Sequence, residues 1–383
     1  MSINVIINGQ RVEVSEGHTV LDAINANGYY VPQLCKDPDM KPIGACRTCL
    51  VQIEGIRGYP TACSTPLSDE MNITTYGEDV DRIRAGVLDL TLGMVNDYKS
   101  VGQLSEAASK FGLSESSWNA RVREVADTSN PVFDIAMSSC ILCARCVNAC
   151  QDSHQFIGAI DYLGTGEKSR IGTFLDRPLI DSICTTCGQC LSVCPTGAIH
   201  IKEKVDDGLN GPTDKSELRI VSSTCPYCGV GCGIKMGIDS EDNISEIEDD
   251  PNNLSSVGML CVKGRFGQSF VTHQDRLTGP LIRRDGVLQP ATWDEALDLI
   301  THNLIKFRGN SFGTLCSAKA TNEDGYIQQK FTRLLMQSNN IDHCTRLCHA
   351  PSVEAMLTSL GSGATSNSYT DYEDARCLVV IGC

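Results

Sequence analysis

The sequence has little of several features that define common classes of protein. Phe, Trp and Tyr make up only 5% of its 383 residues, and no apolar run approaches the length of a membrane span. Nucleic-acid binding is disfavoured, because 47 Asp and Glu residues outnumber 32 Lys and Arg residues and phosphate binding needs a basic surface. No basic, apolar leader precedes the first apolar segment, so we expect a soluble, cytoplasmic protein.

Cysteine, in contrast, is abundant, with 21 residues, many of them separated by only two or three others. In a reducing compartment this clustering indicates metal binding rather than disulfide formation. Two copies of C-x2-C-x2-C-x3-C lie in the centre of the chain: Cys140, Cys143, Cys146 and Cys150, then Cys184, Cys187, Cys190 and Cys194. Thiolates at every third residue make a short loop wrap around one compact object, and a cubane [4Fe-4S] cluster fits that description.

The fourth cysteine of each run is expected to serve the other run. In two-cluster ferredoxins with this spacing, that cysteine ligates the neighbouring cluster. Cys194 would then complete the first site and Cys150 the second, which holds the two clusters close together. A structural zinc ribbon is the alternative, but zinc sites usually take two ligands from each of two knuckles and leave no thiol of the same spacing unused.

The N-terminal segment predicts a small ferredoxin-like domain. Residues 3–7 and 11–14 form a hairpin around Asn8-Gly9, and Thr19 caps a helix that ends at Gly28. Four cysteines follow with the spacing C-x10-C-x2-C-x13-C: Cys35, Cys46, Cys49 and Cys63. Four thiolates after a hairpin and one helix suit a [2Fe-2S] cluster, although the spacing differs from the plant type. A four-thiolate zinc site is the alternative.

Between the cysteine clusters lies a long segment without metal-binding residue types. Residues 64–139 contain neither cysteine nor histidine. The apolar spacing of Ile83, Val87, Leu90 and Met94 predicts a helix whose stripe packs on the preceding domain.

A further cysteine cluster follows a predicted linker. Residues 206–215 are rich in Asp, Gly, Lys and Pro, which is typical of a linker. Beyond it the chain has C-x2-C-x3-C and then a distant fourth cysteine: Cys225, Cys228, Cys232 and Cys261. Three close thiolates and one distant thiolate suit another cubane cluster of a different kind of site. Zinc is the alternative if these residues are taken alone.

The last hundred residues predict an α/β domain. Thr292 and Glu295 form a capping box, and Ala296, Leu297, Ile300, Leu304 and Phe307 form the apolar stripe of the helix that follows. Residues 312–318 predict a strand, 321–336 a capped helix and 377–381 a buried parallel strand. This alternation is typical of a doubly wound sheet, whose ligands bind beyond the carboxyl ends of strands, here Ser317–Lys319 and Gly382–Cys383.

The last predicted strand also bears on the length of the protein. A buried parallel strand needs helices over both faces of its sheet. We therefore expect the chain to be a fragment, or a natural truncation, of a longer subunit; an ordinary C-terminal strand is the alternative.

Together these segments resemble the catalytic (alpha) subunit of the molybdenum- or tungsten-dependent formate dehydrogenases, in the cytosolic NAD(P)- or ferredoxin-linked group. The iron–sulfur region is similar to the large iron–sulfur subunit of NADH dehydrogenase. The most specific piece is Arg346-Leu347-Cys348-His349 followed by Pro351-Ser352-Val353. In that family the metal-ligating cysteine or selenocysteine and an adjacent histidine lie at this position.

The resemblance implies roles for single residues. Cys348 would ligate molybdenum or tungsten held by two molybdopterin guanine dinucleotides, and a soft thiolate suits such an ion. His349 would handle the proton or orient formate, and Lys263 would lie between a cluster and one pterin. The expected pterin contacts are Ser317, Lys319, Asn322, Gly363 and Thr365. From spacing alone, a buried small cysteine and a core histidine are the simpler interpretations of Cys348 and His349.

The chain also departs from this family. The family has a histidine and three cysteines for one more [4Fe-4S] cluster where this chain has residues 94–104, so we expect that cluster to be absent. The family's arginine for formate lies past the last residue of this chain. Four cysteines have no assigned partner and are interpreted as ordinary core residues: Cys316, Cys344, Cys377 and Cys383.

The predicted fold class is therefore a multidomain α+β protein. Its domains are a [2Fe-2S] ferredoxin-like domain (1–80), a helical connector (81–130), a two-[4Fe-4S] ferredoxin domain (131–205), a [4Fe-4S] domain of the molybdopterin oxidoreductase type (218–275) and the start of a molybdopterin-binding α/β domain (276–383). The resemblance implies formate oxidation or CO2 reduction with a flavin-containing NAD(P)H subunit, a hydrogenase or a ferredoxin-type carrier as partner. The alternative is an electron-transfer subunit of an NADH dehydrogenase or a bifurcating hydrogenase, without molybdenum or tungsten chemistry.

Metal analysis of the anaerobically purified chain tests the cysteine assignments. One [2Fe-2S] and three [4Fe-4S] clusters predict about 14 iron atoms per chain. Molybdenum or tungsten is expected only in the complete catalytic protein. Zinc in place of iron would contradict all four cluster assignments.

Overall fold

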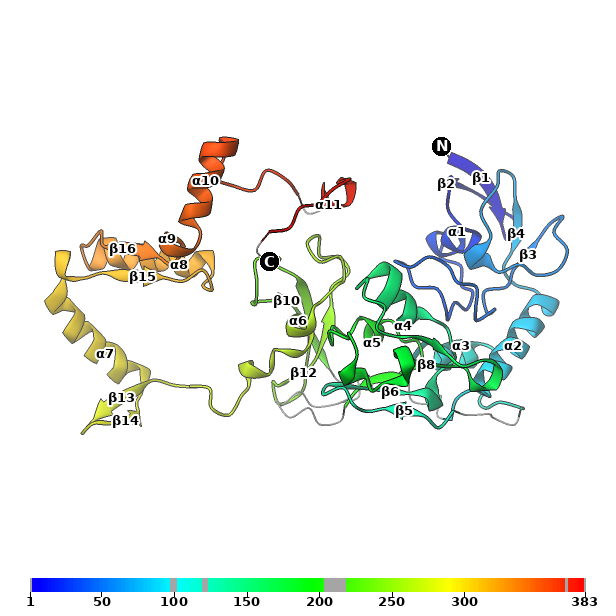
Figure 1. Ribbon diagram of the computed structural model, residues 1–383, viewed down its shortest axis with the longest axis horizontal. Coiled ribbons are helices and arrows are strands. Elements are labelled where there is room, and N and C mark those ends of the chain that lie inside the picture. Colours follow the sequence, from blue (N-terminus) through cyan, green and yellow to red (C-terminus); the bar gives the residue numbers. More distant parts are fainter. Residues whose placement is uncertain (1, 97–101, 119–122, 203–217, 369–370, 382–383) are drawn as a thin grey trace. The chain divides into compact units, whose positions relative to one another are not determined.

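The computed structural model describes residues 2–96, 102–118, 123–202, 218–368 and 371–381 (Figure 1). The predicted linker at 206–215 and Gly382–Cys383 lie outside these ranges. The chain divides into two compact units, Met1–His273 and Gln274–Cys383, which are considered separately. Within the described ranges, no helix is long and apolar enough to cross a membrane.

The first unit begins with the predicted hairpin, β1 (Ser2–Ile7) and β2 (Gln10–Ser15), which confirms that prediction. Asn8 and Gly9 have φ of 54° and 83°, as a tight two-residue turn between right-twisted strands requires. The sheet has the order β2-β1-β4-β3, with β3 (Gln52–Ile53) and β4 (Asn72–Thr74). Helix α1 (Val20–Ala26) starts at Thr19, whose capping box with Asp22 confirms the predicted cap.

Two helices cover the loops that carry the first cysteines, α2 (Glu78–Leu92) and α3 (Gly102–Lys110). The predicted helix is confirmed, but its predicted stripe is wrong. Leu90 is 53% exposed, and the buried positions are Val80, Arg84, Leu88, Thr91 and Leu92. The hydrophobic pattern missed this face because a buried arginine occupies one of its positions.

The double-ferredoxin region surrounds a small antiparallel sheet in the order β5-β6-β9. Its elements are β5 (Ala126–Asp127), β6 (Phe133–Ala136), α4 (Arg145–Asn148), β7 (Asp161–Leu163), β8 (Arg170–Gly172), α5 (Gln189–Ser192) and β9 (Ile199–Ile201). Phe133 and Ile135 of β6 and Ile199 of β9 are buried in its core. A three-stranded sheet then follows, β10 (Arg219–Thr224), β11 (Gly233–Ile238) and β12 (Ile244–Asp249), with the short helix α6 (Val262–Phe266).

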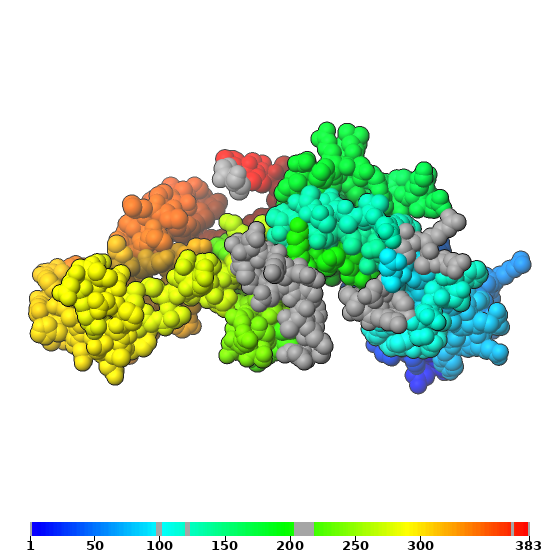
Figure 2. Space-filling view, turned by 90° about the horizontal axis from the view of Figure 1, so that it is seen from below, coloured from blue at the N-terminus to red at the C-terminus, as the bar shows by residue number. Residues whose placement is uncertain are grey.

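The second unit opens with a hairpin and a helix, β13 (Leu281–Arg284), β14 (Val287–Pro290) and α7 (Trp293–Leu304). The hairpin turns at Asp285 and Gly286, a turn signal that the sequence interpretation missed. Thr292 and Glu295 form the predicted capping box, which is therefore confirmed. The predicted stripe of α7 is wrong in its burial: Ala296 is buried, but Leu297 and Ile300 are about half exposed. Figure 2 shows the surface of this segment in yellow.

A parallel β-α-β unit follows: β15 (Thr314–Cys316), α8 (Asn322–Lys330) and β16 (Ile341–His343). The predicted strand–helix alternation is confirmed, although the strand is shorter than residues 312–318. The predicted helix at 321–336 is α8, continued by a π-helical turn at Phe331–Leu335. After β16 come the helices α9 (Thr345–Cys348), α10 (Ala350–Leu360) and α11 (Asp371–Asp374).

The predicted buried strand at 377–381 is wrong. The described residues of this stretch form no strand and are exposed, up to 87% at Ile381. A strand forms only against a neighbour, and the described strands of this unit pair only as β13 with β14 and β15 with β16.

Arg84 provides a test of how the first unit is held together. Its side chain is 2% exposed, and its Nε and Nη1 donate to the carbonyl oxygens of Leu50 and Thr75 at 2.8 and 2.6 Å. Arg84→Met leaves these buried acceptors without a donor, so we expect a loss of about 2–4 kcal/mol in unfolding free energy. Urea-induced loss of the visible [2Fe-2S] absorption measures it. Arg82→Met, at an exposed position of the same helix, is the control and should not change the midpoint.

Candidate metal centres

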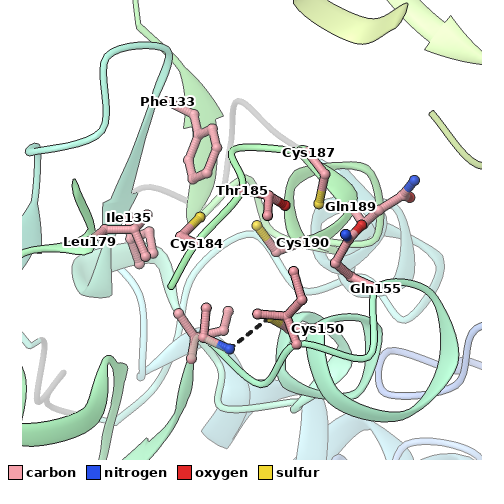
Figure 3. A pocket seen from close by; sticks show the side chains of 14 residues that line it. Phe133, Ile135, Cys150, Gln155, Leu179, Cys184, Thr185, Cys187, Gln189 and Cys190 are labelled. Atoms are coloured by element: carbon pink, nitrogen blue, oxygen red, sulfur yellow. Dashed lines mark hydrogen bonds between the residues drawn. The ribbon is translucent and has the colours of Figure 1, made fainter. Parts of the chain in front are cut away.

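The eight central cysteines line two separate cavities, each with three from one run and one from the other. One cavity is lined by Cys150, Cys184, Cys187 and Cys190 (Figure 3). The second is lined by Cys140, Cys143, Cys146 and Cys194. The structure thus brings the cysteines together in the crossed arrangement that the spacing predicts.

The two cysteine loops have the same local backbone. In the first run Leu142 and Ala144 have φ of 56° and 64°, and in the second Thr186 and Gly188 have φ of 54° and 76°. These residues flank the second cysteine of each run. Left-handed backbone at non-glycine residues costs free energy, so its repetition at matching positions indicates a functional constraint. The left-handed backbone curls each cysteine loop around its cavity.

Backbone amides point at the sulfur atoms of these loops. The N–H groups of Leu142 and Thr186 donate to Sγ of Cys140 and Cys184 at 3.4 and 3.3 Å. The amide of Ala159 donates to Sγ of Cys150 at 3.2 Å, the contact drawn in Figure 3. Amide donors stabilise negative charge on sulfur, and they are a recognised control on the reduction potential of iron–sulfur sites.

Burial makes bare thiolates unfavourable in both cavities. It is the main cause that raises the pKa of Cys140 to about 11 and of Cys143 to about 12. It also raises the pKa of Cys146 and Cys190 well above the ordinary value. A cationic metal core in each cavity would replace the thiol protons and stabilise the thiolates. The four-thiol sets, their amide donors and their cavities therefore fit [4Fe-4S] clusters.

The N-terminal cysteines also converge. A thiol–thiol hydrogen bond to Cys35 is the main cause that raises the pKa of Cys46, and one to Cys63 is the main cause that lowers the pKa of Cys49. For Cys63 the bond to Cys35 lowers the pKa, but the bond to Cys49 and burial outweigh it and raise the value to about 11. Each of the four thiols is thus next to at least one other, which fits a four-thiolate [2Fe-2S] site.

The last cysteine set of the first unit is more open. Cys225 is buried, Cys232 is half-buried, and Cys228 and Cys261 are exposed. The amide of Cys225 donates to the carbonyl oxygen of Cys232 at 2.9 Å. Burial and the charges of the other three cysteines raise the pKa of Cys232, so the four thiols share one neighbourhood. Within the described ranges, no three His, Cys, Asp or Glu side chains converge closely enough to hold a single metal ion.

Two buried arginines that sequence reasoning missed join successive cysteine sets. Arg265, four residues after Cys261, donates from Nε to the carbonyl oxygen of Cys187 at 3.3 Å and pairs with Asp249 at 2.9 Å. Arg145, between Cys143 and Cys146, contacts the segment after Cys35. A lone arginine inside a cysteine run, such as C-A-R-C, is the signal that could have found the second of these.

Gly188 shows how closely the sets approach. A Cβ at this position would lie 2.5 Å from Arg265 Cδ and 2.7 Å from Phe266 Cζ. The α6 segment of the following site therefore packs directly on the Cys187 loop.

In the second unit, the predicted pterin loop and the predicted metal ligand lie at the same edge of the sheet. Cys316 and His343 are paired at the carboxyl ends of β15 and β16. The amide of Ala318 donates to Sγ of Cys344 at 3.2 Å, which connects the loop of Ser317 and Lys319 to the helix α9 that ends in Cys348. This edge is where doubly wound sheets bind ligands.

The remaining predicted site residues of this unit have looser surroundings. Cys348, the last residue of α9, and His349, the N-cap residue of α10, are both exposed. Asn322 opens α8, and Gly363 lies against α10, since a Cβ there would be 3.0 Å from Val353 Cγ1. Thr365 is also exposed. Lys263 belongs to α6 of the first unit, and its role stays a prediction.

Among the cysteines without an assigned partner, the prediction of core positions is wrong. Cys316 is half-buried, and Cys344 and Cys377 are exposed. In this unit, the described layers do not enclose the sheet, so a small apolar side chain is not buried by its sheet position alone. Cys383 lies outside the described residues.

Comparison with family models assigns a domain to most of the chain. Residues 1–78 match a 2Fe-2S iron-sulfur cluster binding domain, and residues 130–200 match the ferredoxin-like domain of NADH-quinone oxidoreductase subunit 3. Residues 218–273 match the molybdopterin oxidoreductase Fe4S4 domain, and residues 276–383 match molybdopterin oxidoreductase. The chain is thus a series of iron–sulfur domains followed by a molybdopterin oxidoreductase domain. The predicted fold class is confirmed.

Similar curated proteins carry the name of one enzyme family. One from Staphylococcus haemolyticus, named "Putative formate dehydrogenase", is 31% identical over 99% of this chain and 42% of its own length. One of the same name from Staphylococcus aureus strain Mu50 is 29% identical with the same coverage. The predicted resemblance is confirmed, and the chain spans 42% of the length of these relatives. A solved NAD+-reducing [NiFe]-hydrogenase chain is 25% identical, with a TM-score of 0.49, over 54% of this chain and 90% of that one.

The crossed arrangement predicts which cluster each fourth cysteine serves. Cys194→Ser should change the same EPR signal as Cys143→Ser, because both line one cavity, and should spare the signal that Cys187→Ser changes. The measurement is low-temperature EPR of the reduced, iron-loaded chain. Cys316→Ser is the control and should leave every signal intact. If Cys194→Ser instead gives the pattern of Cys187→Ser, the crossed assignment fails.

Proposed function

We propose that this chain works as part of a formate dehydrogenase catalytic subunit, which oxidises formate to CO2 or carries out the reverse reaction. The observation that carries the proposal is the position of Cys348-His349. The pair follows β16 in a domain that matches molybdopterin oxidoreductase. The neighbouring loop of Ser317 and Lys319 follows the parallel strand β15. Relatives named as formate dehydrogenases support the choice of substrate.

The side chains at this edge have the chemistry that the reaction needs. When bound, a molybdenum or tungsten ion with two molybdopterin guanine dinucleotides supplies the two-electron chemistry. The Cys348 thiolate would hold that ion as a soft ligand. His349, next to it, would handle the proton or orient formate, tasks that suit an imidazole side chain. The expected contacts with the pterins and their phosphates are Ser317, Lys319, Asn322, Gly363 and Thr365, with Lys263 towards the nearest cluster.

The cysteine sets of the first unit are proposed to hold the electron relay. When bound, iron–sulfur clusters carry electrons one at a time. Cys225, Cys228, Cys232 and Cys261 would hold the cluster nearest the metal site in sequence. The two crossed sets would hold the central pair, and the N-terminal set a [2Fe-2S] cluster. Contacts of Arg265 with the Cys187 loop and of Arg145 with the Cys35 loop support this order.

The partner is proposed to be another electron-transfer subunit. The match of residues 130–200 to the ferredoxin-like domain of NADH-quinone oxidoreductase subunit 3 supports a flavin-containing NAD(P)H-oxidising subunit. A hydrogenase or a ferredoxin-type carrier is the alternative partner. Each would exchange electrons with the [2Fe-2S] end of the chain.

A second candidate function is an electron-transfer subunit of an NADH dehydrogenase or bifurcating hydrogenase complex. The same match of residues 130–200 favours it, because the matching model is named for a subunit of NADH-quinone oxidoreductase. Cys348-His349 favours the first candidate, since an electron carrier has no use for that pair. Molybdenum or tungsten bound to the complete protein would decide for the first.

Substitution of the pair tests the catalytic proposal. In the complete protein, Cys348→Ser should abolish formate oxidation, and His349→Ala should lower kcat by about 100-fold or more. Both should keep the wild-type iron content and cluster EPR signals, because neither residue belongs to a cluster set. Activity is measured with an artificial electron acceptor. Cys377→Ser, an exposed cysteine of the same unit, is the control. Retained formate turnover in Cys348→Ser would refute the assignment.

A further inference from the structure

Arg145 is a buried cation between two of the proposed cluster sites. It lies between Cys143 and Cys146 at the start of α4, and its side chain is only 4% exposed. Its charge is one of the influences that lower the pKa of Cys143, against the larger opposing effect of burial. Burial of a charged side chain costs several kcal/mol unless nearby groups compensate it. The groups around the Arg145 side chain therefore have to compensate for its burial.

The guanidinium group joins three segments that are far apart in sequence. Nη2 donates to the carbonyl oxygen of Lys36, the residue after Cys35. Nη1 donates to Gln103 Oε1 at 2.9 Å and to the carbonyl oxygen of Val193, the residue before Cys194, at 3.4 Å. One side chain thus fixes the loop of the N-terminal cysteines, helix α3 and the last cysteine of the first cavity.

Its negative partners do not balance its charge. The carboxylate of Asp37 is 3.9 Å away, and the buried Nε has no hydrogen-bond partner among the described residues. Arg265, at the junction of the next two cysteine sets, differs because Asp249 pairs with it at 2.9 Å. Arg145 therefore keeps more uncompensated positive charge than its counterpart.

Arg145 lines a cavity that also has polar and charged residues, among them Lys36, Gln103 and Glu106, but the cysteine loops beside it are buried among apolar residues. Leu34, Cys35, Ile141 and Cys143 belong to one buried cluster with the inner faces of α2 and α3, and Cys46 packs against it. Tyr162 lies near cysteines of both sites. Burial is the main cause that raises the pKa of Tyr162, and the charges of Cys143 and Cys35 raise it further. In a buried site a charge acts strongly over several ångströms. Arg145 lies two residues after Cys143 and donates to the carbonyl oxygen of the residue after Cys35, so its charge is close to both cysteine loops.

We propose that Arg145 is a positioning residue that locks the Cys35 loop against the Cys140–Cys146 loop, and that its charge stabilises the reduced forms of the clusters these cysteines hold. This inference rests on the proposed iron–sulfur sites and not on formate as substrate. One-electron reduction adds one negative charge to a cluster, and a fixed cation nearby favours that product over the oxidised form. The residue thereby raises the reduction potential at the junction.

EPR-monitored redox titration of the full, anaerobically purified chain tests this role. After iron content has been matched to wild type, Arg145→Met should shift the midpoint potentials of the [2Fe-2S] cluster and of the cluster that Cys143→Ser abolishes to lower values. The expected change is at least tenfold in the reduction equilibrium, or about 59 mV for a one-electron couple. Arg82→Met, an exposed arginine of the first unit, is the matched control and should leave both potentials unchanged.

Two further variants separate charge from structure. Arg145→Lys keeps the positive charge, so its midpoint potentials should lie close to those of the wild type. Asp37→Asn removes the nearby carboxylate and should move both potentials in the opposite direction, upward, which decides the question even if Arg145→Met fails to load iron. Iron-loaded Arg145→Met with unchanged potentials, or Asp37→Asn without a rise, would overturn the proposal.

The outcome is also distinguishable from that of the proposed function. The titration needs no formate and no molybdenum or tungsten. Shifted potentials in a protein without formate activity would support the role of Arg145 and refute the substrate. A wild-type chain that binds no iron would overturn both.

Discussion

The crossed exchange of one cysteine between two loops is the constraint on which the first unit depends. Each central cavity takes three thiols from its own run and the fourth, Cys150 or Cys194, from the other. Neither set is complete until the two runs, separated by more than thirty residues, have folded together. The strands and helices around them are short, so the shared thiols add to the apolar core in defining their arrangement.

Burial and backbone strain at these loops make metal loading part of the fold. Left-handed residues such as Leu142 and Thr186 and the raised pKa values of Cys140 and Cys143 are both unfavourable in the absence of a cation. A metal core replaces the protons and uses the curled backbone as its support. The buried arginines then extend this arrangement from one set to the next, with Arg265 paired to a carboxylate and Arg145 less fully compensated.

Local signals predicted local structure well. The Asn8-Gly9 turn, the caps at Thr19 and Thr292 and the alternation of strand and helix after residue 312 were confirmed, because each depends on backbone preferences of a few neighbouring residues. Burial was predicted less well. The face of α2 was missed because Arg84 is buried there, and residues 377–381 remain exposed because no described strand pairs with them. Burial depends on what packs against an element, which periodicity does not contain.

By itself, the sequence determined the four cysteine sets, since thiol spacing along a loop limits which centre the loop can surround. It also determined the order of domains, and its resemblance to a known family singled out the Cys348-His349 pair. Only the tertiary structure decided how the sets are joined. The Lys36 carbonyl, Gln103 and Val193 meet at Arg145 from three separate segments, and no local pattern brings them together. A buried guanidinium finds its partners through space, because hydrogen bonds and charge act between neighbours in the fold.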